Sequence, residues 1–293
     1  MVLPTRTLGR TGLEVTQLGF GTALRLKPED GFGDDQAERI LHTVLDSGIN
    51  FIDTAPDYGE SEAWIGRYLH QRRDEFYLAT KCGCNIDVDG NRLEPGHLWT
   101  ADRARRNIDQ SLQRMQTEYV DILQMHNPSV EEVEQGGLIP VLEELKQAGK
   151  TRFIGVSSTA PHLMAFAQLG VFDVFQVPYS GLERTHEQML EQIADGGAGV
   201  IVRGGIAQGG RGQGERWARW ERAQLDEIAE GMSRYEFILR FTLSHAACHT
   251  TIVGTTQLDH LQSNLAAFQA GPLSADVYQE AKNRLAQSGE GPG

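Results

Sequence analysis

The chain has 293 residues, of which 40% are hydrophobic and 23% are charged, close to an ordinary globular protein. Its net charge of −13 repels phosphate backbones and anionic lipids, which argues against nucleic-acid or membrane-surface binding. Three cysteines do not make a disulfide framework. We find neither a signal peptide nor an apolar run of the ~18 residues that span a bilayer, so we expect a cytoplasmic protein.

The chain opens with a turn signal, Gly9-Arg10-Thr11-Gly12, so residues 1–14 predict a small β-hairpin. Eight short apolar runs then alternate with longer segments suited to helices. Several runs, such as Val200-Ile201-Val202, are continuously apolar, which is typical of parallel strands covered on both faces. The predicted strands span residues 15–19, 49–53, 76–81, 120–126, 153–157, 174–177, 200–203 and 251–254.

Helix boundaries are marked between these strands. Thr100 predicts an N-cap that precedes apolar residues at helical spacing. Gly48 and Gly149 predict the ends of two helices, and the glycines of segment 196–199 end another. A last apolar stripe at helical spacing consists of Leu258, Leu261, Leu265 and Phe268.

Eight strand-then-helix units favour an α/β protein built as a (β/α)8 TIM barrel with a short N-terminal β-hairpin. The main alternative is an open doubly wound sheet, but Gly19-Phe20-Gly21 lacks the third glycine of a dinucleotide-binding turn. We expect one domain over residues 1–287 and a flexible tail over residues 288–293. The glycine-rich connection 204–219 shows no periodicity and predicts a long loop that could act as a lid.

Ionisable residues end three consecutive predicted strands. Asp53 ends the second strand, Lys81 the third and His126 the fourth. Because the carboxyl ends of barrel strands meet at one rim, where barrel enzymes carry their active sites, we expect these side chains to form a catalytic site.

Tyr58 follows Asp53 by five residues, so its loop can fold back over this rim. A phenol with a pKa near 10 is a poor proton donor at neutral pH. The Lys81 ammonium, held by the Asp53 carboxylate, is expected to lower that pKa, while His126 orients a substrate oxygen.

The sequence resembles the aldo-keto reductase family over nearly its whole length. The resemblance is carried, in chain order, by segments 8–15, 18–22, 51–59, 80–81, 121–126, 154–158, 176–180 and 252–256. It implies a catalytic tetrad of Asp53, Tyr58, Lys81 and His126. It also implies NADPH as the cofactor and a small aldehyde or ketone as the substrate.

The resemblance also implies where the cofactor binds. Ser157, Ser158 and Gln176 would hydrogen-bond the carboxamide, and the 204–209 loop would cover the pyrophosphate. Loops after strands seven and eight are favoured phosphate sites in barrels. The full set of expected cofactor-binding residues is Gly21, Thr22, Ser157, Ser158, Gln176, Arg203, Gly204, Gly205, Ile206, Gly209, Gly254, Thr255, Thr256, His260 and Asn264.

Three positions depart from the family pattern. Ser158 replaces a frequent Asn, which weakens carboxamide binding. Arg203 replaces an aromatic residue that stacks on nicotinamide; its guanidinium can stack, or can reach a phosphate or an acidic substrate. His260 replaces an Arg of NADPH-selective members, so NADH is an alternative cofactor.

Other residue patterns are interpreted as structural, and no metal site is predicted. Cys82-Gly83-Cys84 is interpreted as a packed strand end because no second pair follows it. His245 and His249 would share a helix face, but no zinc-protease glutamate follows His245. Segment 87–91 predicts a tight turn instead of a calcium loop. Trp217 and Trp220 either line the substrate or anchor a loop.

Two other functions are consistent with a barrel of this kind. A nicotinamide-binding sensor or regulatory subunit would bind cofactor without turnover, although all four tetrad residues argue against it. A lyase or isomerase could use Lys81 as a Schiff-base amine, although the pairing of Asp53 with Tyr58 disfavours this. The oligomeric state is not predicted.

Overall fold

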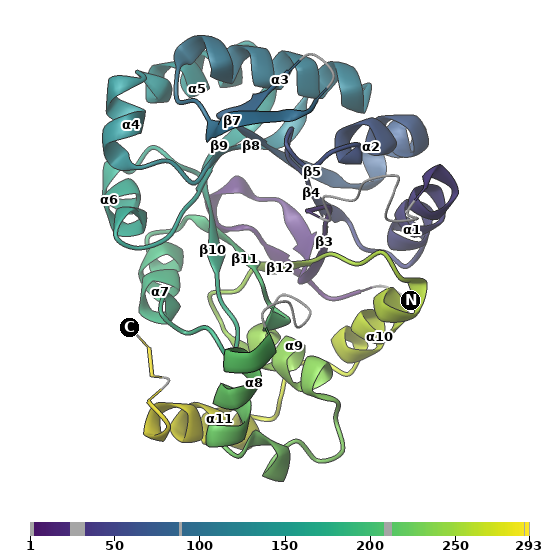
Figure 1. The fold of residues 1–293 in the computed structure, drawn as a ribbon, viewed down its shortest axis with the longest axis vertical. Helices are drawn as coiled ribbons and strands as arrows, with labels where there is room; N and C mark the ends of the chain where they lie inside the picture. The colour runs from purple at the N-terminus through teal and green to yellow at the C-terminus, as the bar shows by residue number, and fades with distance from the viewer. Residues whose placement is uncertain (1–2, 24–32, 88–89, 208–212, 290, 293) are drawn as a thin grey trace.

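Parallel strands close into a barrel at the centre of the molecule (Figure 1). The structure is a computed structural model that describes residues 3–23, 33–87, 90–207, 213–289 and 291–292. The barrel strands pair in the circular order β10-β11-β12-β3-β4-β5-β8-β9. Their bounds are β3 Leu18–Gly21, β4 Phe51–Asp53, β5 Tyr77–Cys82, β8 Val120–His126, β9 Thr151–Ser157, β10 Val174–Pro178, β11 Gly199–Arg203 and β12 Thr250–Val253. The predicted (β/α)8 barrel is confirmed.

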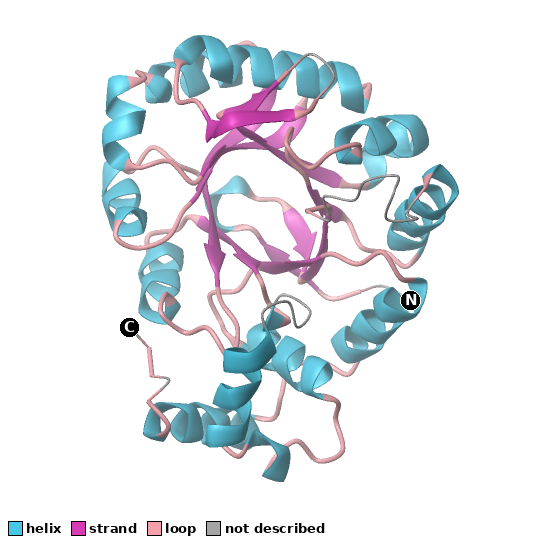
Figure 2. Ribbon diagram, viewed as in Figure 1, coloured by secondary structure: helices cyan, strands magenta, loops and turns pink. Residues whose placement is uncertain are grey.

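Helices surround the barrel on its outer side (Figure 2). The α-helices are α1 Asp34–Asp46, α2 Ser61–Leu69, α3 Ala101–Met115, α4 Val130–Gln135, α5 Leu138–Gln147, α6 His162–Leu169, α7 Glu187–Asp195, α8 Gln213–Arg222, α9 Arg234–Ser244, α10 Leu258–Gln269 and α11 Ala275–Gln287. Short 3-10 helices are η1 Gly9–Thr11, η3 His70–Glu75 and η5 Leu225–Glu227. None of these helices combines the length and the apolar character needed to cross a bilayer in the part of the chain that the structure describes.

Local sequence signals set several helix ends. The Thr100 hydroxyl accepts a hydrogen bond from the Arg103 amide, 3.2 Å away, and so caps α3 as predicted. Gly48 and Gly149 adopt positive φ angles of 91° and 76° just after α1 and α5. These positions suit glycine because it carries no Cβ. The boundaries predicted from these signals are confirmed.

The N-terminal hairpin covers the amino-terminal end of the barrel. Its strands, β1 Thr5–Thr7 and β2 Glu14–Thr16, pair antiparallel on either side of η1. Leu8, Leu13 and Val15 are buried together with side chains from inside the barrel. The carboxyl-terminal end of the barrel is therefore the end left for a functional site.

The predicted strand over residues 15–19 is wrong. The structure divides that run between β2, which ends at Thr16, and β3, which starts at Leu18. The Thr16 amide donates to the Asn50 side chain at 2.7 Å, and its hydroxyl donates to the Leu18 carbonyl at 2.8 Å. These hydrogen bonds mark the end of the hairpin before the barrel begins. They could not be predicted from the apolar run over residues 15–19.

A second hairpin, absent from the sequence prediction, directly follows β5. It pairs β6 Cys84–Ile86 with β7 Arg92–His97, with Cys84 opposite His97. The Asn91 amide donates to the Asp87 carboxylate at 2.8 Å, whereas residues 88–89 of the turn predicted over segment 87–91 lie outside the described residues. The hairpin therefore extends the chain from the carboxyl end of β5 beside the mouth.

Two further predictions are corrected. Segment 204–219 is not one long loop, because α8 starts at Gln213 and buries Trp220 against Phe237, with ring centroids 5.3 Å apart. Gly209 lies outside the described residues. His245 and His249 do not share a helix face, because α9 ends at Ser244.

Candidate active site

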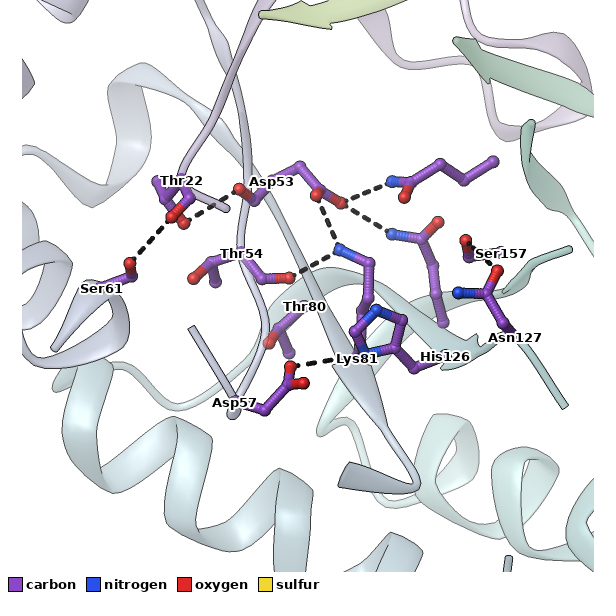
Figure 3. A network of polar contacts seen from close by, with 12 residues as sticks. Thr22, Asp53, Thr54, Asp57, Ser61, Thr80, Lys81, His126, Asn127 and Ser157 are labelled. Carbon is purple, nitrogen blue, oxygen red and sulfur yellow. Dashed lines mark hydrogen bonds and ion pairs between the residues drawn. The ribbon is translucent and has the colours of Figure 1, made fainter. Parts of the chain in front are cut away.

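A buried ion pair lies at the carboxyl-terminal mouth of the barrel. The Lys81 Nζ donates to Asp53 Oδ2 at 2.7 Å and to the Thr54 carbonyl oxygen at 2.9 Å (Figure 3). Neither charged side chain exposes more than 2% of its surface. The adjacent strands β4 and β5 supply the two groups, since Asp53 ends β4 and Lys81 is the penultimate residue of β5.

The second oxygen of Asp53 is held by two amides. Asp53 Oδ1 accepts from Gln124 Nε2 at 3.0 Å and from Gln176 Nε2 at 2.8 Å. Asp53 is thereby fixed by side chains from β5, β8 and β10. Gln124 was not predicted as a site residue, although a Gln two residues before His126 faces the same side of the strand and is an available signal.

Tyr58 lies in the loop after β4 and packs over the Lys81 ammonium. The Nζ lies 5.1 Å from the centre of the Tyr58 ring, and the ring of His126 meets the ring of Tyr58 edge-on with centroids 5.8 Å apart. Tyr58 is buried, with 8% of its surface exposed. The structure therefore brings the side chains of the four predicted tetrad residues together.

The electrostatics of this site correct one expectation. Burial raises the pKa of the Tyr58 phenol, and this effect outweighs the lowering by Lys81, so the net shift is upward. For Lys81, burial opposes the charged form, but the Asp53 carboxylate and Tyr58 prevail and raise its pKa. At neutral pH the site therefore holds a protonated phenol beside a charged ammonium.

His126, at the end of β8, contacts groups that the sequence analysis did not assign to the site. Its Nδ1 lies 3.3 Å from Cys84 Sγ and 3.5 Å from Asp57 Oδ1. The ring of His97 meets the ring of His126 with centroids 4.8 Å apart, and stacks on Trp99 with centroids 5.6 Å apart. The unpredicted β6–β7 hairpin, which carries Cys84 and His97, therefore packs directly beside His126.

The expected carboxamide-binding residues lie at neighbouring strand ends. Ser157 and Ser158 are buried at the end of β9, where the Ser157 hydroxyl donates to Asn127 Oδ1 at 3.1 Å. The Ser158 amide donates to the Gln176 carbonyl at 3.1 Å. The Gln176 side chain donates one N–H to Asp53, and a glutamine amide carries a second N–H and an acceptor oxygen besides.

Arg203 ends β11, where it lies opposite Pro178 at the end of β10. Burial lowers the pKa of its guanidinium, while Glu183, Tyr58 and Asp53 act in the opposite direction. Its Nε is buried, and no group within the described part of the chain accepts a hydrogen bond from it. A buried N–H without an acceptor fits an anionic or carbonyl-bearing cofactor, and Gly204, Gly205 and Ile206 follow it directly.

The remaining expected cofactor residues lie after β3, after β12 and on α10. Gly21 ends β3, and the amide of Thr22 donates to the Asp53 carbonyl at 2.9 Å. After β12, Gly254 is exposed whereas Thr255 is buried, and Thr256 accepts at its carbonyl from the Gln36 side chain. His260 is exposed and Asn264 is buried on α10. The pairing of β11, β12 and β3 puts these segments side by side.

The fold and the site define a (β/α)8-barrel protein whose ionisable groups converge at the carboxyl ends of the strands. Residues 17–285 match the model of the Aldo/keto reductase family. The chain belongs to the aldo/keto reductase family, whose members are oxidoreductases that act on carbonyl groups.

Individual relatives agree with this assignment. The chain is 31% identical over 286 residues to L-galactose dehydrogenase of Arabidopsis thaliana, covering 89% of this chain and 87% of the relative. It is 33% identical over 218 residues to the NADH-specific methylglyoxal reductase of Escherichia coli, covering 69% and 67%.

The fold is also similar to a solved aldo-keto reductase of Bacillus halodurans. The holo form of that protein is matched with a TM-score of 0.83 at 29% identity, and the apo form with a TM-score of 0.77 at 27% identity. Each match covers 96% of both chains.

Proposed function

We propose that this protein is an NAD(P)H-dependent reductase that converts small aldehydes or ketones into alcohols, with Tyr58 as the general acid. The observation that carries the proposal is the buried Asp53–Lys81 pair beneath the Tyr58 ring, with His126 at the edge of that ring. A bound nicotinamide cofactor supplies the hydride; the residues of the chain supply the proton and the orientation.

Tyr58 holds the proton that the substrate oxygen receives. Its raised pKa keeps the phenol protonated at neutral pH, so the acid form is the resting form. When the proton leaves, the phenolate is stabilised by the Lys81 ammonium, which Asp53 keeps in place at 2.7 Å. A preorganised charge of this kind stabilises the transition state more than the ground state.

His126 orients the substrate oxygen toward Tyr58. Because its Nδ1 faces Cys84 and Asp57, we assign Nε2 to the hydrogen bond with the substrate. General acid catalysis needs the donor within hydrogen-bond reach of the acceptor, and the close Tyr58–His126 approach is compatible with one oxygen bound by both.

We assign the cofactor to the strand ends that adjoin this site. Ser157, Ser158 and the remaining atoms of Gln176 would bind the carboxamide, and Arg203 would bind a phosphate or the carboxamide oxygen. Segments 21–22 and 204–206, together with Gly254, Thr255, Thr256, His260 and Asn264, would hold the rest of the cofactor. NADPH and NADH are both assigned as cofactors because His260 offers the 2′-phosphate a weaker partner than arginine.

The substrate class is a small carbonyl compound. This assignment follows the names of two relatives, a methylglyoxal reductase and an L-galactose dehydrogenase, and the close approach of His97 and Asp57 to His126. We found no observation that supports a non-catalytic sensor or a Schiff-base lyase. The cytoplasmic location and the single-domain boundaries stay predictions.

The proposal is tested by cofactor binding followed by turnover. Purified protein is titrated with NADPH and with NADH by fluorescence, and then mixed with a panel of small aldehydes and ketones while cofactor absorbance is followed. We expect saturable binding and cofactor oxidation that depends on the carbonyl. Binding of neither cofactor, or binding without turnover on any carbonyl, would contradict the proposal.

A further inference from the structure

Four side chains around His126 have the chemistry of metal ligands. Asp57, Cys84, His97 and His126 each offer one ligand atom, and these four atoms lie within 4.8 Å of one another. They come from the loop after β4, from β6, from the end of β7 and from the end of β8. In Figure 3, the Asp57 carboxylate points toward the ring of His126.

Three of these atoms already have the spacing of a tetrahedral zinc site. The measured separations are 3.3 Å from Cys84 Sγ to His126 Nδ1, and 3.5 Å from Asp57 Oδ1 to each of these two atoms. Zinc bonds of about 2.0–2.3 Å at tetrahedral angles put neighbouring ligand atoms about 3.3–3.6 Å apart. The three atoms therefore form one face of a coordination tetrahedron without rearrangement.

His97 is positioned to complete the tetrahedron. It is paired with Cys84 across the β6–β7 hairpin, and its ring stacks on Trp99 with an interplanar angle of 10°. Trp99 packs onto Gly83, where a Cβ would lie 2.0 Å from the indole ring. Only glycine admits this packing, so the residue between Cys82 and Cys84 helps to fix the imidazole beside the thiol.

The chemistry of the donors selects the metal. A thiolate and two imidazoles suit zinc, whereas calcium and magnesium require oxygen ligands. With an ionised Asp57 and a Cys84 thiolate, the ligand set carries two negative charges that match one Zn²⁺. The Arg92 guanidinium lies 3.6 Å from Asp57 Oδ2, so one carboxylate oxygen can serve the metal while the other keeps its ion pair.

We propose that Asp57, Cys84, His97 and His126 form a tetrahedral Zn²⁺ site whose occupancy inhibits the enzyme. Binding forms a Zn–S bond and releases the Cys84 thiol proton to solvent, with no change in oxidation state. Inhibition follows because the metal, bound at Nδ1, locks the ring of His126 in place, so that Nε2 can no longer turn toward the substrate oxygen. The inhibition rests on the proposed function, whereas metal binding does not.

Metal binding is tested by titrating the chelator-treated protein with Co²⁺, followed by Zn²⁺. We expect one equivalent of Co²⁺ to give the intense visible bands of a tetrahedral ion and a thiolate-to-metal charge-transfer band, and Zn²⁺ to abolish both. Cys84→Ser should remove the charge-transfer band and weaken Co²⁺ binding by at least roughly 10–100-fold. Changes to residues that only hydrogen-bond the ligands of a metal already weaken binding by that factor.

The matched control is Cys248→Ser, which alters a buried cysteine outside the cluster and should leave the spectrum unchanged. His97→Gln tests the same site should Cys84→Ser fail to fold, and should weaken Co²⁺ binding while it keeps a thiolate band. Wild-type protein that takes up no stoichiometric metal, or equal binding by the Cys84 and Cys248 variants, would overturn the site.

Inhibition is measured as the ratio of NADPH oxidation rates with and without one equivalent of Zn²⁺, within each variant. For wild type and Cys248→Ser we expect a ratio well below one, and a chelator should restore the rate of oxidation. For His97→Gln we expect a ratio near one. If wild type shows the cobalt spectrum but oxidises NADPH as fast with Zn²⁺ as without it, or faster, the proposed inhibition is wrong and the proposed metal site stands. Absence of carbonyl turnover would reject the proposed function and leave the spectroscopic test intact.

Discussion

The Lys81 ammonium and the Asp53 carboxylate lie 2.7 Å apart, and neither group reaches solvent. Two glutamine amides and a backbone carbonyl complete the hydrogen bonds of the pair. A buried charge left without its partner is strongly destabilising, because desolvation is no longer offset. The pair therefore holds the Lys81 ammonium beneath the Tyr58 ring, and the stability of the barrel depends on it.

Asp53→Asn should lower the free energy of unfolding by about 3–5 kcal/mol, since it leaves Lys81 buried without a countercharge. Urea denaturation measures the change. The matched control is Asp109→Asn, which removes the exposed partner of Lys150 and should cost about 0–1 kcal/mol. Equal losses of unfolding free energy in the two variants would show that the buried ion pair stabilises the protein no more than the exposed one.

The stability of the protein should rise with pH between about 4 and 6.5 through His245. Burial lowers the pKa of this imidazole to about 4 in the folded protein, below the unfolded value of 6.5. The unfolded chain therefore binds more protons in this window, and the slope contributed is at most about 1.4 kcal/mol per pH unit.

Unfolding free energies of wild type and His245→Gln, measured at several pH values, test this contribution. The variant should show a flatter dependence in the window, whereas His70→Gln, which changes an exposed imidazole, serves as the matched control. A His245→Gln profile parallel to that of wild type would remove His245 as the source.

Gly66→Ala should destabilise the packing of α2 against α3. A Cβ at this position would lie 2.1 Å from the Arg114 carbonyl oxygen, so the helices must separate, at a cost of about 1–3 kcal/mol. Gly214→Ala on α8 meets no atom within 4 Å and should be neutral or stabilising by up to about 1 kcal/mol. Thermal unfolding compares the stabilities of the two variants with that of wild type. A Gly66→Ala protein as stable as wild type would refute the close packing of α2 on α3.

Cofactor preference should respond to residue 260. His260→Arg adds a permanent charge to the exposed first turn of α10, and we expect the ratio of the NADH to the NADPH dissociation constant to rise about tenfold, or about 1.4 kcal/mol. His70→Arg adds the same charge elsewhere and should leave the ratio unchanged. An unchanged ratio in His260→Arg would place the 2′-phosphate away from this residue.

The rim of ionisable residues could be predicted from the sequence because it depends on strand ends alone. Asp53, Lys81 and His126 follow from the rule that the carboxyl ends of parallel strands meet. The pKa of Tyr58 could not be predicted, because its direction depends on how deeply the packed chain buries the ring.

The β6–β7 hairpin was also missed. Residues such as Arg92 and Glu94 are exposed, so its second strand shows no apolar run, and its pairing with the Cys84 strand has an irregular register. Helix α8 was missed because glycines precede it and hide the periodicity of Trp217 and Trp220.

Turnover of Tyr58→Phe tests the central assignment most directly. Tyr119→Phe, the same change at a half-buried tyrosine just before β8 and thus at the opposite end of the barrel, is the matched control. With cofactor binding verified by titration, we predict that Tyr58→Phe reduces aldehydes about 10²–10⁴-fold more slowly than wild type, while Tyr119→Phe keeps its rate. Wild-type turnover by Tyr58→Phe would contradict the assignment of Tyr58 as the proton donor.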